Sequence, residues 1–173
     1  MSHSYSTALA ASRTILKILR VLNAAVGAAM VAWFVATFLF EPTVRDFFTK
    51  QPARIDSGLL MPILRVWMLL AAPVIATIHI LLSRLLEMVE TVRAGEPFVP
   101  ANARRMKTIA WCVLALQLFD LVCGVMASAM NLAGSRIPWS FSITGWVAVL
   151  LLFVLARVFD EGARIRSDLE AMI

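Results

Sequence analysis

Asp120 is the one charged side chain in the apolar stretch formed by residues 108–130. A carboxylate inside a membrane can carry protons, hold a cation or pair with an arginine. Asp120 lies about 19 Å along a helix from Lys107, close to the middle of a bilayer. Because an ionised carboxylate costs upwards of about 2.5 kcal/mol there, we expect Asp120 to be neutral, paired or turned into a helix bundle.

Three arrangements of Asp120 are open. The first is a structural intramembrane pair with Arg65, which lies about 9 Å away in depth and has a side chain long enough to reach inward. The second is a neutral Asp120 that is hydrogen-bonded to Gln117, Ser128 or another helix. The third is a proton or ion pathway, although such a pathway normally needs more than one buried polar group in a helix.

The sequence predicts no metal site, no cofactor and no enzymatic activity. Cys112 and Cys123 lie about 16 Å apart along one predicted helix, so we interpret them as apolar packing residues and not as a disulfide. A metal site made of Asp120, Cys123 and the distant His79 is a weaker alternative, because no His/Cys cluster has zinc spacing. A glycine-rich phosphate loop, an HExxH motif and a Ser/His/Asp grouping are also missing from the sequence.

The composition indicates that these residues lie in lipid. Of the 173 residues, 61% are hydrophobic and 16% are charged, whereas soluble domains have about half and about a quarter. A basic region precedes the first apolar stretch, but this stretch of about 20 residues is too long for a signal peptide and fits an uncleaved transmembrane helix. The uncharged or nearly uncharged stretches long enough to cross about 30 Å of hydrocarbon are 21–40, 66–83, 108–130 and 137–156.

We therefore predict a single-domain, all-α integral membrane protein that forms a four-transmembrane-helix bundle. The predicted helices cover about 21–40, 62–92, 103–130 and 138–170. An outer loop at 41–61 holds a short surface helix in PTVRDFFTKQ, and a cytoplasmic loop covers 93–102. Apolar residues continue at helical spacing beyond Ser83 and Ala156, which predicts cytoplasmic helical extensions of the second and fourth helices.

The distribution of positive charge predicts the orientation. Eleven of the 16 lysines and arginines lie in the N-terminal tail, in residues 84–107 or in the C-terminal tail, and five lie in the other two connections. Loops rich in lysine and arginine stay in the cytoplasm. Both termini are therefore predicted to be cytoplasmic, and the protein is predicted to be a multi-pass membrane protein.

The segment RAGEPFVPANARRMK, residues 93–107, interrupts the apolar stretches. We expect Gly95 to end the second helix, Pro97 and Pro100 to fix an extended path, Asn102 to N-cap the next helix and Phe98 to fill a groove between helix ends. These roles fold a hairpin without any further function. Phe98 and the positive charge beside an acidic C-terminal helix nevertheless suggest a partner. The candidate partner-binding residues are Phe98, Asn102, Arg104, Arg105, Glu161 and Arg166.

Together with VFDEGARIRSDLEAMI, residues 158–173, this segment resembles the bacterial membrane-protein family called domain of unknown function 2975. Met106 and Ile165 stand where a leucine would be usual in the family. The resemblance implies a multi-pass protein of a bacterial inner (plasma) membrane and no settled activity. Its members are similar to proteins encoded next to small helix-turn-helix regulators, which implies a membrane partner that sequesters or senses for a transcription factor. The positions with the resemblance are Gly95, Pro97, Phe98, Asn102, Arg105, Glu161, Gly162, Arg166 and Asp168.

We therefore expect a regulatory or interaction protein. Its cytoplasmic face, made of residues 93–107 and the C-terminal helix, is expected to bind a partner such as a small helix-turn-helix transcription regulator. The alternative is a small transporter or channel component that uses Asp120. The expected partners are the lipid bilayer and this regulator; a homo-oligomer is open, and direct binding of nucleic acid is not expected.

Overall fold

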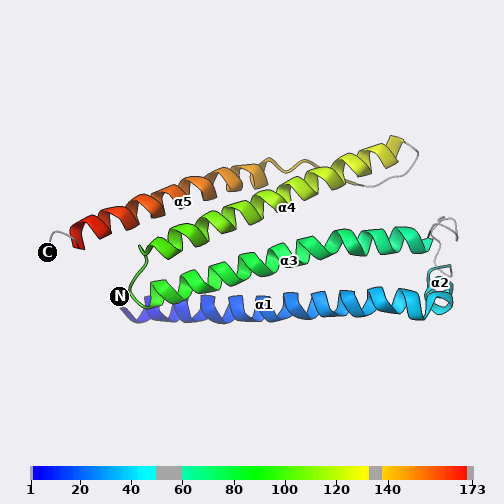
Figure 1. The fold of residues 1–173 in the computed structure, drawn as a ribbon, viewed down its shortest axis with the longest axis horizontal. Helices are drawn as coiled ribbons and strands as arrows, with labels where there is room; N and C mark the ends of the chain where they lie inside the picture. The colour runs from blue at the N-terminus through cyan, green and yellow to red at the C-terminus, as the bar shows by residue number, and fades with distance from the viewer. Residues whose placement is uncertain (1, 50–59, 133–137, 171–173) are drawn as a thin grey trace. The chain divides into compact units, whose positions relative to one another are not determined.

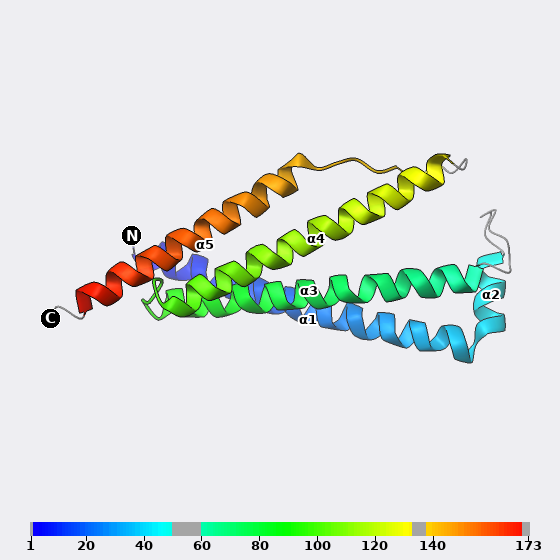
Figure 2. The same ribbon diagram turned by 45° about the horizontal axis from the view of Figure 1, so that its top comes forward.

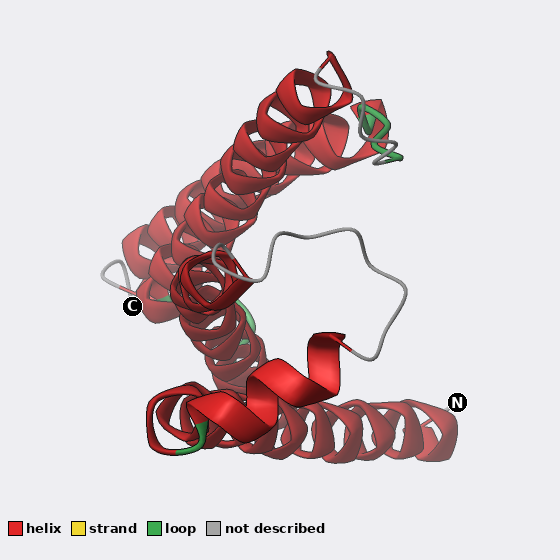
Figure 3. Ribbon diagram, turned by 90° about the vertical axis from the view of Figure 1, so that its right-hand side faces the viewer, coloured by secondary structure: helices red, strands yellow, loops and turns green. Residues whose placement is uncertain are grey.

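The computed structural model describes residues 2–49, 60–132 and 138–170, and the regular structure in these ranges is helical (Figure 1). The helices follow one another as α1 (Ser2–Leu39), α2 (Glu41–Thr49), α3 (Leu60–Arg93), α4 (Pro100–Leu132) and α5 (Ile143–Glu170). The described residues contain no strand, as the colouring in Figure 3 also shows. The prediction of an all-α chain is confirmed for this part of the protein.

Four of the helices are long and apolar enough to cross a membrane. The qualifying parts are Leu9–Leu39, Met61–Arg93, Pro100–Ser128 and Ile143–Leu169. Many of their large apolar side chains are exposed, including Leu39 at 69% and Leu150 at 66%. Soluble monomers rarely expose such extended apolar faces, whereas lipid tails accommodate them. The prediction of four helices of membrane-spanning length is therefore confirmed.

Several helix boundaries differ from the predicted ones. Helix α1 begins at Ser2 instead of residue 21, because the preceding segment is free of proline and glycine and rich in helix-forming residues. Helix α5 begins at Ile143 instead of residue 138, and Trp139 in the non-helical segment packs its ring on Gly124 of α4. Helix α2 lies inside the predicted loop 41–61, as the predicted surface helix does, and residues 50–59 of that loop lie outside the described part.

The chain divides into two compact units, which are described separately. Unit 2 is Ile18–His79. In it, the Asn23 side-chain amide donates a hydrogen bond to the Ile75 carbonyl oxygen at 3.1 Å and so joins α1 to α3. Gly27 lies opposite the same residue, and a Cβ atom there would come within 3.2 Å of the Ile75 side chain. The absence of a side chain at Gly27 thus lets the two helices approach closely.

Unit 1 consists of Met1–Lys17 and Ile80–Ile173. Its α4 and α5 lie side by side, with the C-terminal part of α5 next to the start of α4 (Figures 1 and 2). The buried core cluster combines one residue of α3, two of α4 and one of α5. These residues are Met88, Met106, Ile109 and Ala156. This core holds together the helix ends on either side of the α3–α4 loop, where the candidate site lies.

Candidate functional site at the α3–α4 loop

Gly95 ends α3 in the way that the sequence predicts. Its φ of 82° is a left-handed conformation, which glycine adopts without a steric penalty. The Gly95 amide donates to the Val92 carbonyl oxygen at 3.1 Å, and the Glu96 amide donates to the Thr91 carbonyl oxygen at 3.0 Å. These two hydrogen bonds form a Schellman motif, which satisfies carbonyl groups that the end of a helix leaves free. The predicted role of Gly95 as a helix cap is confirmed.

The predicted N-cap at Asn102 is wrong. Helix α4 begins at Pro100, so that Asn102 already lies inside its first turn. Proline suits the first position of a helix, because its fixed φ is helical and its missing N–H would have no partner there. The backbone N–H of Asn102 donates to the Val99 carbonyl oxygen at 2.9 Å, which makes Val99 the residue that precedes the helix.

The Asn102 side chain connects three parts of the loop instead. It is fully buried, with 0% exposure. Its Nδ2 donates to Thr91 Oγ1 at 2.7 Å and to the Pro97 carbonyl oxygen at 2.9 Å, and its Oδ1 accepts from Arg105 Nη1 at 2.9 Å. The Thr91 hydroxyl has one proton, which it donates to the Met88 carbonyl oxygen at 2.8 Å. Asn102 therefore joins the end of α3, the loop and the first turn of α4.

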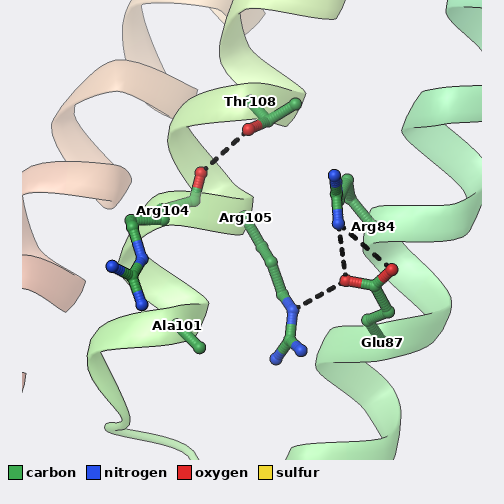
Figure 4. A pocket seen from close by; sticks show the side chains of 6 residues that line it. All are labelled: Arg84, Glu87, Ala101, Arg104, Arg105 and Thr108. Carbon is green, nitrogen blue, oxygen red and sulfur yellow. Dashed lines mark hydrogen bonds and ion pairs between the residues drawn. The ribbon is translucent and has the colours of Figure 1, made fainter.

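Glu87 forms a second link between α3 and α4. Its Oε2 accepts hydrogen bonds from Arg84 Nη1 at 2.9 Å and from Arg105 Nε at 2.9 Å (Figure 4). Arg84 lies one turn away on the same helix, whereas Arg105 comes from α4. Because the Glu87 side chain is 37% exposed, solvent screens each ion pair, and we expect each to contribute at most about 1 kcal/mol. One carboxylate thus holds two guanidinium groups.

These three residues line a hollow of about 330 Å³ between α3 and α4. In Figure 4 the Arg104 guanidinium lies on the opposite side of α4 from Glu87. Arg104 is therefore directed away from the ion pairs, although it is the direct neighbour of Arg105 in the chain. The other lining residues are Ala101, Arg104 and Thr108.

Phe98 joins the loop to α5. Its ring lies 5.7 Å from the ring of Phe159, measured between centroids. A Cβ atom at Gly162 would lie only 2.9 Å from Phe98 Cδ1, so glycine at this position leaves the space that the ring fills. The ring thus packs against α5, and its neighbours there are residues of the family-like C-terminal motif; that Phe98 fills a groove between helix ends stays a prediction.

Five of the six candidate partner-binding residues fall into two groups, and Arg166 stands apart. Asn102 and Arg105 hold the loop to α3 and α4, and Phe98 holds it to α5, although Phe98 is 45% exposed. Arg104 and Glu161 are exposed on α4 and α5 and make no side-chain hydrogen bond or ion pair with another described residue. Arg166 is half-buried and has an interaction partner. The first group explains the architecture, and Arg104 and Glu161 are accessible to a partner.

Arg65 has partners within unit 2. Its Nη2 donates to the Thr37 carbonyl oxygen at 2.7 Å and to Glu41 Oε2 at 3.0 Å, and its Nε donates to Thr37 Oγ1 at 3.4 Å. The guanidinium carbon also lies 3.9 Å from the centroid of the Phe38 ring. The predicted pair of Arg65 and Asp120 stays a prediction, because the two residues belong to different units.

Asp120 is exposed on α4. Among the described residues of unit 1 it has no hydrogen-bond or ion-pair partner. The Ser128 hydroxyl donates to the Gly124 carbonyl oxygen at 2.8 Å, and the Gln117 amide packs against Gly145 of α5. Within the described ranges no group of three His, Cys, Asp or Glu side chains is placed to hold a metal ion.

The family model described as "Protein of unknown function (DUF2975)" matches residues 47–173. The chain belongs to this family. The matched region contains α3, α4, α5 and every residue of the loop site. Neither the curated proteins nor the solved structures that were compared with the chain gave a match. The family is thus established, and its description assigns no activity to these residues.

Sequence reasoning missed Glu87 and Thr91, the α3 residues that hold Arg105 and Asn102. A signal was present in their spacing, because residues four apart on a helix share one face. That face is directed at α4, where Asn102 and Arg105 are three apart and also share a face.

Proposed function

We propose that the protein spans a bacterial inner membrane with four helices and has both termini in the cytoplasm. The uneven distribution of lysine and arginine and the exposed apolar faces of α1, α3, α4 and α5 support this placement. In this orientation the α3–α4 loop, the start of α4 and the C-terminal ends of α3 and α5 form a cytoplasmic cap.

Reporter fusions test the orientation. Fusions of a cytoplasm-active fluorescent protein and of a periplasm-active phosphatase are placed after Glu96 and after Ile173. We expect fluorescence without phosphatase activity at both positions. Phosphatase activity at either position contradicts the proposed orientation.

We further propose that this cap binds a cytoplasmic protein partner and that the protein is regulatory. The supporting observation is that buried Asn102 and the Glu87 ion pairs hold the cap in one arrangement, while charged residues of α4 and α5 are exposed on it. A rigid surface of this kind loses little conformational entropy on binding. A small helix-turn-helix regulator is the partner that the family resemblance favours.

A photo-crosslinking amino acid at Glu161 tests this proposal in native membranes with the full chain. We expect a discrete protein adduct at position 161 and none at Leu150, an exposed apolar position on the same helix. The adduct should contain a DNA-binding regulator, and expression of that regulator's targets should change when the chain is deleted. Adducts of equal yield at both positions contradict the proposal.

The second candidate function is transport through Asp120. The observation that favours it is the exposed carboxylate in an otherwise uncharged part of α4. Asp120→Asn removes the titratable proton and keeps the shape of the side chain. If the protein is a transporter component, proton-coupled flux into vesicles should fall at least about tenfold, as expected for loss of a required proton carrier. Unchanged flux and unchanged growth across pH eliminate this candidate.

A further inference from the structure

A second hollow, of about 540 Å³, lies between α4 and α5 in unit 1. The two helices run side by side along this stretch (Figures 1 and 2). Two small buried residues, Ala103 on α4 and Ala156 on α5, lie in its lining, and their exposures are 5% and 7%. Larger side chains at these two positions would fill the space. The hollow thus depends on small residues on both helices.

Positive charge gathers around this hollow from both helices. The cations in its lining are Arg104, Lys107, Arg157 and Arg164. All four are exposed, and none of them forms an ion pair with another residue in the described part of the chain. Arg84 and Arg105, by contrast, share Glu87. The arginines of the loop site have their counter-charge within the protein, whereas those of the α4–α5 hollow do not.

Two carboxylates, Asp160 and Glu161, also line the hollow. They are too few to neutralise four cations, so a net charge of about +2 is left at the hollow, taking each group in its usual charge state. Like charges held on two facing helices repel one another, and an anion between them relieves the repulsion. A phosphate group satisfies this arrangement, because arginine binds phosphate oxygens in a bidentate manner.

The other end of the hollow is apolar. Phe153 lines it, and the Phe153 ring meets the Trp111 ring edge to face at a centroid distance of 5.4 Å. Trp111 is 56% exposed, as is typical of tryptophan at the boundary between lipid and water. Beyond this aromatic pair, on the side away from the cations, α5 exposes Leu150 and Leu151 at 66% and 63%. Cations followed by aromatic rings and then by exposed aliphatic side chains match the order of groups in a phospholipid.

We infer that the α4–α5 hollow binds the phosphate headgroup of an anionic phospholipid, with its acyl chains along the apolar face of α5. Basic pockets between transmembrane helices on the cytoplasmic side recognise such headgroups. Free phosphate shares the headgroup chemistry but has no use for the aromatic and aliphatic end. The inference rests on the proposed membrane placement. The hollow shares Arg104 and Glu161 with the surface proposed for the protein partner, so the test separates the two ligands.

The test uses the purified full chain in uncharged detergent micelles, without any partner protein. Binding of dioctanoyl phosphatidylglycerol, dioctanoyl phosphatidylcholine and inorganic phosphate is followed by native mass spectrometry and by Trp fluorescence. We expect phosphatidylglycerol to bind at least about tenfold more tightly than phosphatidylcholine, as two or more cations at a lipid surface predict. Excess inorganic phosphate should not displace it.

Charge-removing variants locate the site. Arg157→Gln with Arg164→Gln should weaken phosphatidylglycerol binding at least about tenfold. The matched control, Lys17→Gln with Arg93→Gln, removes the same charge from exposed positions away from the hollow and should change binding by less than about twofold. Arg104→Gln with Lys107→Gln removes the cations of α4 and should reproduce the loss if the α5 variant does not fold. Circular dichroism verifies the fold of each variant.

Four outcomes overturn the inference. Equal losses in the hollow and control variants indicate attraction by net charge alone. Displacement by inorganic phosphate assigns the hollow to free phosphate, and equal binding of phosphatidylcholine shows that the headgroup charge is not recognised. If the hollow variants bind phosphatidylglycerol normally but lose the protein adduct at position 161, the cations of the α4–α5 hollow serve the protein partner and not a lipid. If the adduct is absent from all variants and lipid binding follows the hollow, the proposed partner fails and the lipid site stands.

Discussion

Each unit of the molecule contains an arginine and a glutamate that join two helices, but the two arrangements differ. In unit 2, Arg65 satisfies several acceptors: Thr37 through two oxygen atoms and Glu41 through its carboxylate. In unit 1, Glu87 serves several donors, since Arg84 and Arg105 share it. The unit 2 cluster depends on one cation, Arg65. The unit 1 cluster depends on one anion, Glu87, which pairs with two arginines and so leaves an excess positive charge.

This difference in charge balance explains why, in the described part of the chain, only the unit 1 cluster has unpaired cations nearby that can bind a ligand. Arg65 uses its donors within the protein and lies over the Phe38 ring, so little of its charge is available. The start of α4, by contrast, has more arginine and lysine than the nearby carboxylates can pair. Excess cations in unit 1 are available to an anionic ligand or partner, while the cluster in unit 2 is a closed structural link.

The largest loss of stability is expected where buried hydrogen bonds are removed, at Asn102 in unit 1. Asn102→Ala leaves the Pro97 carbonyl oxygen and a guanidinium donor of Arg105 without their partner, so we expect the free energy of unfolding to fall by about 3 kcal/mol. Denaturation of the full chain in mixed micelles measures it. Thr14→Ala removes an exposed hydroxyl and should cost less than about 0.5 kcal/mol. Similar losses in both variants contradict the role assigned to Asn102.

Replacement of arginine by lysine tests the dependence on a single cation. Arg65→Lys keeps the charge but cannot donate in the planar fork that reaches Thr37 and Glu41 together, so we expect a loss of about 2 kcal/mol. Arg105→Lys should cost about half as much, because Glu87 retains Arg84. The same denaturation experiment compares the two variants. A larger loss for Arg105→Lys reverses the comparison between the units.

A double-mutant cycle tests the contact between Phe98 and Gly162. Gly162→Ala favours the helix by up to about 1 kcal/mol, but its Cβ displaces the Phe98 ring. We expect a net destabilisation of about 1 kcal/mol in the natural sequence. In a Phe98→Ala background the same change should stabilise the protein by about 0.5 kcal/mol, because only the helix propensity is left. The same sign in both backgrounds shows that the ring does not fill this space.

The smallest expected effect concerns exposed ion pairs. Glu87→Gln removes the charge that two arginines share, and Glu90→Gln removes one partner of the longer Arg13–Glu90 pair, whose N–O distance is 3.3 Å. We expect losses of about 1 kcal/mol and of less than about 0.5 kcal/mol. Added salt should reduce the first loss, since it screens partly exposed charges. If Glu87→Gln and Glu90→Gln lose the same unfolding free energy at low salt, the sharing of Glu87 by two arginines adds no stability.

Local features of this fold were predictable from the sequence. Apolar stretches of membrane length predict the long helices, and glycine after a charged helix end predicts the turn at Gly95. The start of α4 was predictable in principle from Pro100, which suits a first helical position, but Asn102 was given priority as an N-cap. That error arose because asparagine has two roles, and only its neighbours in space decide between them.

The sequence by itself determined the helices, their apolar faces and the positions of charge along them, because these depend on residues within one or two turns. The tertiary structure decided the rest. It gave Arg65 the partners Thr37 and Glu41, placed Phe98 on Gly162 and brought the cations of α4 and α5 around one hollow. Such contacts depend on the axial register and rotation of one helix against another. Side-chain packing between helices fixes both quantities, and helical periodicity within one segment leaves them undetermined.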